Sequence, residues 1–399
     1  MDVRRWLVVA AGVVLLATCR SGPVTSVTVP VALDHNRMLV SAEIQRKDGT
    51  WRTALLWIDT GNPDFLLSEE LAADIGIEPP PAGAETPRAR EVALPAGGRI
   101  GGLPLDFTGV TSKVMAQPRW LFTTMHNDGN LPSTVLQRFQ VVFDYPRRRL
   151  TVAAPGTLAH RGVRVPASVN PATGIVQVDT VIGGRSVGLA IDIGASYTFV
   201  SEDVVAGLAG GHSEWPQARG AVGCANIWGW WPQEEAWPLL RVPEIRIGEA
   251  SLGQVGIVGL PSFFGEGASL GAWYSKKSAR PVDGFLGPNA LRGWRVEIDY
   301  AGAAVYLEKG DGDDAHDLDL VPLTLRPQPD GSYTVIGAAG ADGVQPGDTL
   351  VAIGNLAAKG ATMGTVVDAL RGAPGEVREL TVERGGTRLE VEAKVTRHL

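Results

Sequence analysis

The chain has 399 residues, more than one ordinary domain holds, so we expect two or three domains. Its 44% hydrophobic and 20% charged residues are typical of globular proteins and exclude an intrinsically disordered chain. The formal net charge of −7 supplies no bulk field that would attract nucleic acid, so we expect no nucleic-acid partner. The 50 glycines and 27 prolines indicate many turns and favour β structure with short strands.

The first residues are typical of an export signal. Arg4 and Arg5 precede an apolar run, residues 6–16, that is too short to span a bilayer. The sequence Leu-Ala-Thr-Cys that follows resembles the lipobox of bacterial lipoproteins. This resemblance implies that residues 1–18 are a signal peptide, that Cys19 carries a lipid, and that the protein is anchored to the bacterial cell envelope facing the periplasm. The alternative is an ordinary secretory signal with an incidental cysteine.

The mature chain contains a long internal repeat, whose two copies we place at residues 28–155 and 160–308. Each copy opens with a strand, a tight turn with glycine and a second strand. The second strand runs into Asp-Thr-Gly at residues 59–61 in the first copy and into Asp-Ile-Gly at residues 192–194 in the second. The repeat therefore places one aspartate at an equivalent position in each copy.

The two copies also agree where they end. The closing segment of the first copy, GNLPSTVLQRFQVVFDYPRRRLTV, begins at Gly129, and that of the second, GFLGPNALRGWRVEIDYAGAAVYL, begins at Gly284. Aligned without gaps, both have the opening glycine, a leucine two residues later and an Asp-Tyr pair near the end. This agreement indicates two duplicated lobes.

A different pattern follows the repeat. Residues 309–319 are acidic and contain glycine, which predicts a linker. Residues 320–397 contain a turn and strand in GVQPGDTLVAIGN, an amphipathic helix in TMGTVVDALRG and a hairpin that turns at Gly385-Gly386. Val-Gln-Pro-Gly-Asp followed by Leu-Val-Ala-Ile resembles the signature phrase of a PDZ domain. The resemblance implies a small α/β domain that adds a peptide, such as a substrate C-terminus, to a sheet edge.

The duplicated region resembles the retropepsin-like and pepsin-like aspartic proteases. The resemblance is carried by Asp-Thr-Gly after an apolar strand, by the hairpin before it and by the Gly-x-Leu…Phe…Asp-Tyr block that closes the lobe. It implies a mainly β, bilobal fold built from a pair of β-barrels, with Asp59 and Asp192 as catalytic residues. It also implies supporting roles for Thr60, Gly61 and Gly194, and an extended peptide substrate in the cleft between the lobes.

Paired carboxylates suit peptide hydrolysis for a physical reason. Two carboxylates a few ångströms apart cannot both ionise, so one keeps a proton while the other acts as a base. The base activates a water molecule and the acid protonates the leaving amine, which needs neither a metal nor a covalent nucleophile. The sequence has no HExxH or Cys/His pattern typical of a metal site and no G-x-S-x-G in a strand–turn–helix setting. We therefore expect no cofactor and no metal.

Three positions depart from the family pattern. Ile193 stands where a threonine hydroxyl would hydrogen-bond across to the other lobe, so cross-lobe bonds from Thr60 would be one-sided. Pro132 replaces the glycine that Gly287 supplies in the second copy, and Asn62 stands where a small residue or serine is usual. The alternative function is thus a catalytically inactive protease-fold lipoprotein that binds peptides or scaffolds partners.

A tryptophan-rich stretch, IWGWWPQEEAW, lies between the second aspartate motif and the second closing block. The family has a flap over its cleft at this place. The resemblance implies that Trp228, Trp230 and Trp231 form an aromatic flap that clamps an extended peptide. The alternatives are lobe packing and a membrane-facing patch.

Overall fold

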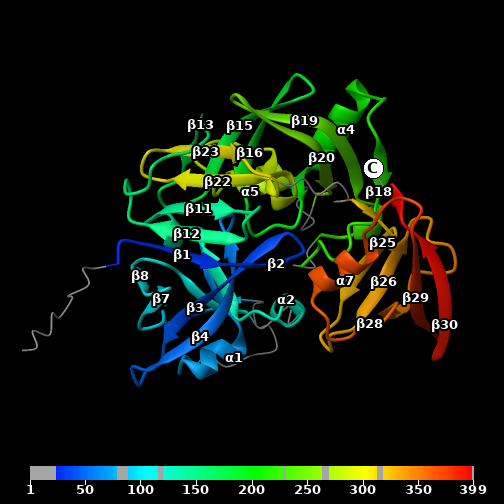
Figure 1. Cartoon of the computed structure of the whole chain (residues 1–399), viewed down its shortest axis with the longest axis horizontal. Helices are drawn as coiled ribbons and strands as arrows, with labels where there is room; N and C mark the ends of the chain where they lie inside the picture. Colours follow the sequence, from blue (N-terminus) through cyan, green and yellow to red (C-terminus); the bar gives the residue numbers. More distant parts are fainter. Residues whose placement is uncertain are drawn as a thin grey trace, which may run out of the picture.

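The computed structural model describes residues 24–78, 89–115, 120–227, 231–262, 269–311 and 318–397. The fold is mainly β, with two lobes and a smaller C-terminal unit (Figure 1), which confirms the predicted fold class. The export signal with Cys19, and the side chains of Trp228 and Trp230, lie outside the described residues. Among the residues that are described, no helix is long and apolar enough to cross a membrane.

The first lobe is built on a nine-stranded sheet. Its centre is β4 (Trp51–Asp59), which pairs with β3 (Arg37–Gln45) on one side and runs parallel to β10 (Gly129–Pro132) on the other. The remaining strands are β2 (Ala32–Asp34), β5 (Phe65–Leu67), β6 (Ala89–Val92), β7 (Gly98–Ile100), β8 (Leu103–Leu105) and β9 (Ser112–Met115). The helices of this lobe are α1 (Glu69–Asp74), α2 (Trp120–Thr123) and α3 (Ser133–Leu136).

The second lobe repeats this plan on an eight-stranded sheet. Its central strand β16 (Arg185–Ile191) pairs with β15 (Val176–Ile182) and runs parallel to β21 (Gly284–Leu286). The remaining strands are β14 (Ser168–Val169), β17 (Thr198–Ser201), β18 (Gln217–Arg219), β19 (Pro238–Ile247) and β20 (Ala250–Leu260). Its helices are α4 (Glu202–Gly211), the 3₁₀-helix η1 (Glu234–Ala236), α5 (Leu270–Ser275) and α6 (Pro288–Leu291).

The two central strands explain the apolar runs that precede both aspartates. The last residues of β4 and β16 are buried on both faces, because alternate side chains pack into different apolar clusters. Asp59 is the last residue of β4 and lies opposite Pro132, while Ile191 at the end of β16 lies opposite Leu286. The carboxyl-terminal ends of these strands therefore fix where each Asp-x-Gly turn begins.

A six-stranded sheet joins the lobes. At its centre β11 (Gln140–Asp144) pairs antiparallel with β22 (Trp294–Asp299), and these strands come from the two closing segments that the sequence shares. The outer strands are β12 (Arg149–Ala153), β1 (Ser26–Pro30), β23 (Ala304–Lys309) and β13 (Val163–Pro166). The order β1-β12-β11 is matched by β13-β23-β22, so an approximate two-fold axis relates the lobes. One apolar core extends through both lobes and this sheet.

The C-terminal unit consists of a sheet with one helix, α7 (Met363–Leu370). The sheet has the order β25 (Leu323–Pro327), β26 (Tyr333–Ala338), β27 (Thr349–Ile353), β29 (Val377–Arg384) and β30 (Thr387–Lys394). The short strand β28 (Leu356–Ala357) pairs with β27, and β24 (Asp319–Leu320) pairs with β31 (Thr396–Arg397). Strand β23 runs to Lys309 and β24 starts at Asp319, so the ends of the predicted linker belong to strands.

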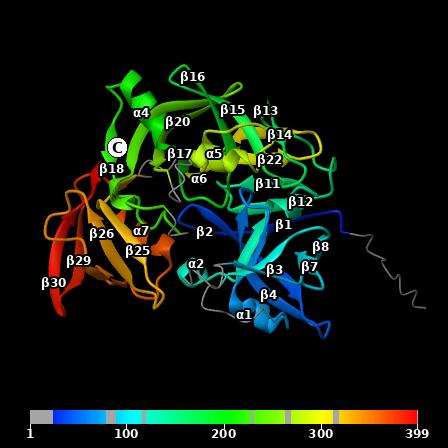
Figure 2. The ribbon, with the colours of Figure 1, turned by 180° about the vertical axis from the view of Figure 1, so that it is seen from behind.

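This unit is packed against both lobes. Seen from behind, α7 faces the end of β2 (Figure 2), where the Gly364 amide donates to Asp34 Oδ1 at 3.0 Å. One apolar cluster combines α7 and the C-terminal sheet with Leu39 and Trp57 of the first lobe and Cys224 of the second. The C-terminal unit therefore shares its core with the lobes.

Asp348, from the Pro-Gly-Asp phrase, anchors this unit internally. It is buried and accepts hydrogen bonds from Arg384 Nε and Nη2 and from the amide of Gln345, each at 2.8 Å. We expect Asp348→Ala to destabilise the protein by about 2 kcal/mol, because it leaves a guanidinium and an amide without their acceptor. Thermal unfolding measures the loss. Asp330→Ala, which breaks an exposed pair with Lys359, is the control and should change the melting temperature little.

Candidate active site

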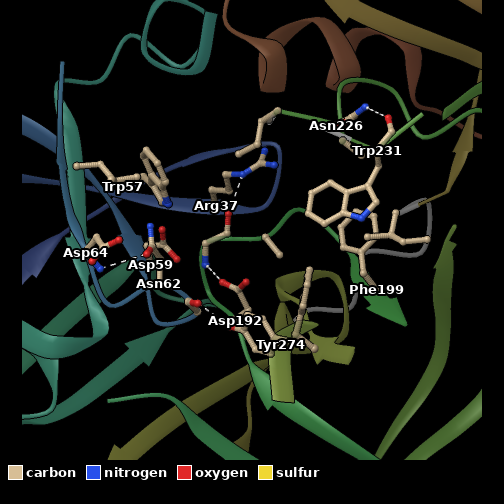
Figure 3. A pocket seen from close by; sticks show the side chains of 18 of the residues that line it. Arg37, Trp57, Asp59, Asn62, Asp64, Asp192, Phe199, Asn226, Trp231 and Tyr274 are labelled. Atoms are coloured by element: carbon tan, nitrogen blue, oxygen red, sulfur yellow. Dashed lines mark hydrogen bonds between the residues drawn. The ribbon is translucent and has the colours of Figure 1, made fainter. Parts of the chain in front are cut away.

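Both predicted catalytic residues lie on one cavity of about 310 Å³. Asp59 and Asp192 project toward it from the first and second lobes respectively (Figure 3). Asp59 ends its buried central strand and Asp192 directly follows the other, and the exposed fractions of the two residues are only 4% and 9%. The structure thus brings together two carboxylates that are 133 positions apart in the sequence.

The two glycines of the motifs lie against the opposite carboxylates. A Cβ atom at Gly61 would be 2.3 Å from Asp192 Oδ2, and a Cβ atom at Gly194 would be 2.7 Å from Asp59 Oδ1. Real Cβ atoms essentially never approach another atom this closely, so a side chain at either position would displace a carboxylate. Glycine is therefore required here for close approach of the two lobes.

Amide side chains hold Asp59. Asn130 Nδ2 donates to Asp59 Oδ2 at 3.2 Å, and its Oδ1 accepts from the Leu66 amide at 2.7 Å. Asn62 also lies close enough to lower the pKa of the Asp59 carboxyl group. Sequence reasoning missed Asn130, which the repeat aligns with Phe285, an apolar residue. A polar residue aligned with an apolar one, within otherwise similar closing segments, was the signal that could have identified Asn130.

The surroundings raise the pKa of both carboxyl groups. Burial, and then the nearby Asp192, raise the pKa of Asp59 to about 7, against the opposing effect of its amide donors. Burial raises the pKa of Asp192 to about 6, while the Gly194 amide, which donates to Oδ1 at 2.8 Å, and the charge of Arg37 lower it. Two buried acids that repel each other when charged titrate as a pair. The pair therefore retains a proton in acidic and near-neutral solution.

Thr60 braces the site across the lobes. Its Oγ1 donates to the Ile191 carbonyl at 2.7 Å and accepts from the Ile193 amide at 2.9 Å. The Ile193 side chain is fully buried in the core and makes no equivalent bond. Within the two Asp-x-Gly motifs, hydroxyl bracing therefore runs in one direction only, from Thr60 of the first lobe to the second.

Two residues that sequence reasoning missed add further bracing. Arg37 Nε, from the first lobe, donates to the Gly194 carbonyl at 2.9 Å, and the Tyr274 hydroxyl, from the second lobe, donates to the Gly61 carbonyl at 2.7 Å. Each motif glycine is thus held by a side chain of the opposite lobe. Arg37 is fully buried, and burial lowers its pKa to about 10, so it remains charged at neutral pH. These contacts supply the restraint that Ile193 cannot.

Pro132 is accommodated in the first lobe. It has φ −79° and ψ 163°, values that proline adopts readily, and α3 begins directly after it. The Ser133 amide and hydroxyl both donate to the Asn62 carbonyl, at 3.0 and 2.9 Å. At the equivalent Gly287 a Cβ atom would lie 2.0 Å from the Tyr197 carbonyl oxygen, so only the second lobe requires glycine.

The rest of the cavity wall includes a group of aromatic residues. It includes Trp231 of the predicted flap, whereas Trp228 and Trp230 lie outside the described residues. The other aromatic lining residues are Trp57, Phe199, Trp237, Trp273, Tyr274 and Phe285. Lys277 also lines the cavity, with Nζ 4.4 Å from the centre of the Trp273 ring, and burial lowers its pKa. Such a wall suits large apolar side chains.

The described residues contain no group of three or more His, Cys, Asp or Glu side chains that could hold a metal ion. No family model and no curated protein matches the chain. Among solved structures, the chain is similar to the aspartic proteinase from Irpex lacteus, at 14% sequence identity and with a TM-score of 0.42. That match covers 73% of this chain and 99% of the other.

Proposed function

We propose that the chain is an aspartic peptidase in which Asp59 and Asp192 hydrolyse peptide bonds with an activated water molecule. One observation carries the proposal: two buried carboxylates, one from each lobe, line one cavity, and each lies against the glycine of the opposite motif. This reciprocal placement follows the two-fold relation of the lobes. A single buried aspartate in a turn would not require a glycine of the opposite lobe to lie against it.

The chemistry follows from the shared proton. The ionised carboxylate takes a proton from water, whose oxygen attacks the peptide carbonyl carbon. The protonated carboxyl group hydrogen-bonds the carbonyl oxygen and stabilises the negative charge that develops there. A proton then passes to the leaving nitrogen, the C–N bond breaks, and the products are a carboxylic acid and an amine. The cross-lobe bonds of Thr60, Arg37 and Tyr274 keep both carboxyl groups in position.

The substrate of this proposal is an extended peptide with large apolar side chains. The aromatic wall favours such side chains, and Trp231 and Trp273 lie with their ring centres 6.5 Å apart on the second-lobe side. We further propose, from the sequence, that a lipid on Cys19 tethers the enzyme to the cell envelope. The mass of the mature protein tests the anchor, because a diacylated and N-acylated cysteine adds a defined mass.

Activity should have a bell-shaped pH dependence. The active form carries one proton on the pair, so it is lost when the pair gains a second proton in acid and when it loses its only proton in alkali. Since burial and mutual repulsion raise the pKa of Asp59 to about 7, we expect kcat/KM to fall above neutral pH. Initial rates on a fluorogenic peptide between acid and alkaline pH measure the profile. A rate that keeps rising at alkaline pH would point to a different base.

A further inference from the structure

The edge strand of the C-terminal sheet is already occupied by another segment of the chain. Strand β25 pairs with β26 on one side only, and its other side bonds to Gly223 of the second lobe. The Gly223 amide donates to the Leu323 carbonyl at 3.3 Å, and the Leu325 amide donates to the Gly223 carbonyl at 2.9 Å. This is a parallel β-bridge between Gly223 and Thr324. The bridge uses the main-chain groups through which a sheet edge adds a peptide strand.

The segment around Gly223 contacts both β25 and α7. The Ala221 amide donates to Thr324 Oγ1 at 2.8 Å, and Ala221 has a φ of 55°, which is uncommon for a residue other than glycine. On the opposite side of Gly223 lies α7, since a Cβ atom at this glycine would be 2.7 Å from Val367 Cγ2. Cys224 is buried in the apolar cluster of the C-terminal unit. The segment thus lies between β25 and α7, with its backbone on the strand edge.

The same segment continues into the wall of the candidate active site. Ala225, Asn226 and Ile227 line the cavity that holds Asp59 and Asp192, as does Trp231. Figure 3 shows Asn226 and Trp231 on the side of the pocket opposite Trp57. The wall and the occupied strand edge are therefore consecutive stretches of one chain.

A second contact ties this wall to the same strand. Asn226 Nδ2 donates to the Trp231 carbonyl at 2.8 Å and to Glu234 Oε2 at 2.6 Å. Arg326, on β25, donates to Glu234 Oε1 through Nε at 2.9 Å and Nη2 at 2.8 Å. Glu234 is buried, whereas the Arg326 side chain is 47% exposed, so this ion pair lies where the wall meets solvent. Strand β25 thus contacts the cavity wall at Gly223, before the tryptophan-rich stretch, and at Glu234, within it.

We propose that the edge of β25 is a peptide-strand binding site whose occupant is the chain's own segment 220–225, and that this occupancy positions the substrate-facing wall of the cleft. Gly223 and Thr324 are then positioning residues, and Arg326 supports them. An extended peptide from another molecule can add to this edge only after segment 220–225 leaves, which displaces the wall. Binding of a peptide at the C-terminal unit is thereby coupled to substrate binding. The catalytic half of this inference rests on the proposed function.

Gly223→Ala in the full chain tests the proposal, with Gly354→Ala as its matched control. Both glycines have similar positive φ values, +57° and +52°, so both substitutions impose similar backbone strain. Only the methyl group at 223 meets a neighbour, Val367, because a Cβ atom at 354 has nothing within 4 Å. In Gly223→Ala we expect amide hydrogen exchange of β25 to rise at least about 10-fold and KM for a peptide about 10-fold, with kcat within about 2-fold. The control should match the parent protein.

Two further variants separate positioning from loss of fold. Gly223→Ala combined with Val367→Ala removes the clash and should restore both exchange protection and KM. Thr324→Val removes only the hydroxyl that accepts from Ala221 and should raise exchange at residues 220–225 without lowering the melting temperature much. Unchanged exchange in Gly223→Ala, or an equal rise in the control, overturns the proposal. The exchange comparison needs no substrate, so it decides the strand-edge proposal even if no peptide is cleaved.

Discussion

Asp59→Asn and Asp192→Asn, made separately, are each expected to lower kcat/KM by at least about 10³-fold. Asparagine has nearly the same shape as aspartate, but it can neither take a proton from water nor give one to a leaving amine. Both losses should be of similar size because the two carboxyl groups act as one unit. Steady-state rates on a peptide that the parent protein cleaves measure the effect. Asp64→Asn is the control, because Asp64 lines the same cavity but pairs with Lys113 at 2.6 Å.

The same two variants should gain stability at neutral pH. Burial raises the folded-state pKa of both groups above the unfolded value of 3.8, so the folded parent protein loses stability as the pH rises from 3.8 to about 7. This loss of folding stability is absent below the unfolded pKa and complete above the folded pKa of about 7. We therefore expect each variant to melt at a higher temperature than the parent at alkaline pH and at a similar temperature in acid. An inactive variant that is less stable at every pH would indicate a structural role instead.

Gly61→Ala and Gly194→Ala should each lower kcat/KM by at least about 10²-fold, since a displacement of about 1 Å at a reacting group has an effect of this size. The added methyl group at 61 would lie 2.3 Å from Asp192 Oδ2, and the one at 194 would lie 2.7 Å from Asp59 Oδ1. Each substitution therefore disturbs the carboxylate of the other lobe. Peptide cleavage and thermal unfolding, measured together, separate misplacement from unfolding.

Gly210→Ala provides the comparison for these glycine variants. Gly210 lies in α4, and a Cβ atom there has no neighbour within 4 Å. Alanine favours helix over glycine by about 1 kcal/mol, so this variant should be fully active and no less stable than the parent. Full activity in Gly61→Ala would contradict the close approach of the two motifs.

Much of the fold could be predicted because local sequence patterns indicate its strands and turns, and because these patterns occur twice. The hairpins, the apolar strands before Asp59 and Asp192 and the two closing segments all recur along the chain. The structure places those closing segments together as β11 and β22, at the centre of the shared sheet. A repeat in the sequence implied this symmetry, because equivalent strands of duplicated lobes can meet across a two-fold axis.

The bracing residues could not be predicted from local pattern. Arg37 and Tyr274 act on glycines that lie 157 and 213 residues away in sequence, and neither is part of a repeated motif. Their hydrogen bonds depend on how the two lobes pack together, and the spacing of residues in the sequence does not predict this packing. For the same reason, the sequence alone overstated how much cross-lobe restraint is lost through Ile193, which has no hydroxyl. The missing hydroxyl is one of several cross-lobe contacts, and the others come from elements that the motif does not include.

The position of the C-terminal unit relative to the lobes likewise could not be predicted from the sequence. Its Pro-Gly-Asp phrase, helix and hairpin predicted a small α/β domain that binds a peptide, and these signals give no information on what the unit packs against. The structure packs the unit against both lobes through Met363, whose amide donates to the Thr124 carbonyl at 2.8 Å, and through the bridge to Gly223.

Cleavage of a mixed peptide pool by the purified mature chain tests the central claim most directly. The new ends are identified by mass spectrometry at mildly acidic pH, with Asp59→Asn and Asp192→Asn run in parallel. Peptide hydrolysis by the two carboxylates predicts defined new termini beside large apolar residues in the parent sample and an intact pool in both variants. An intact pool in all three samples, or cleavage that survives both substitutions, would contradict it and would favour a peptide-binding protein on this fold.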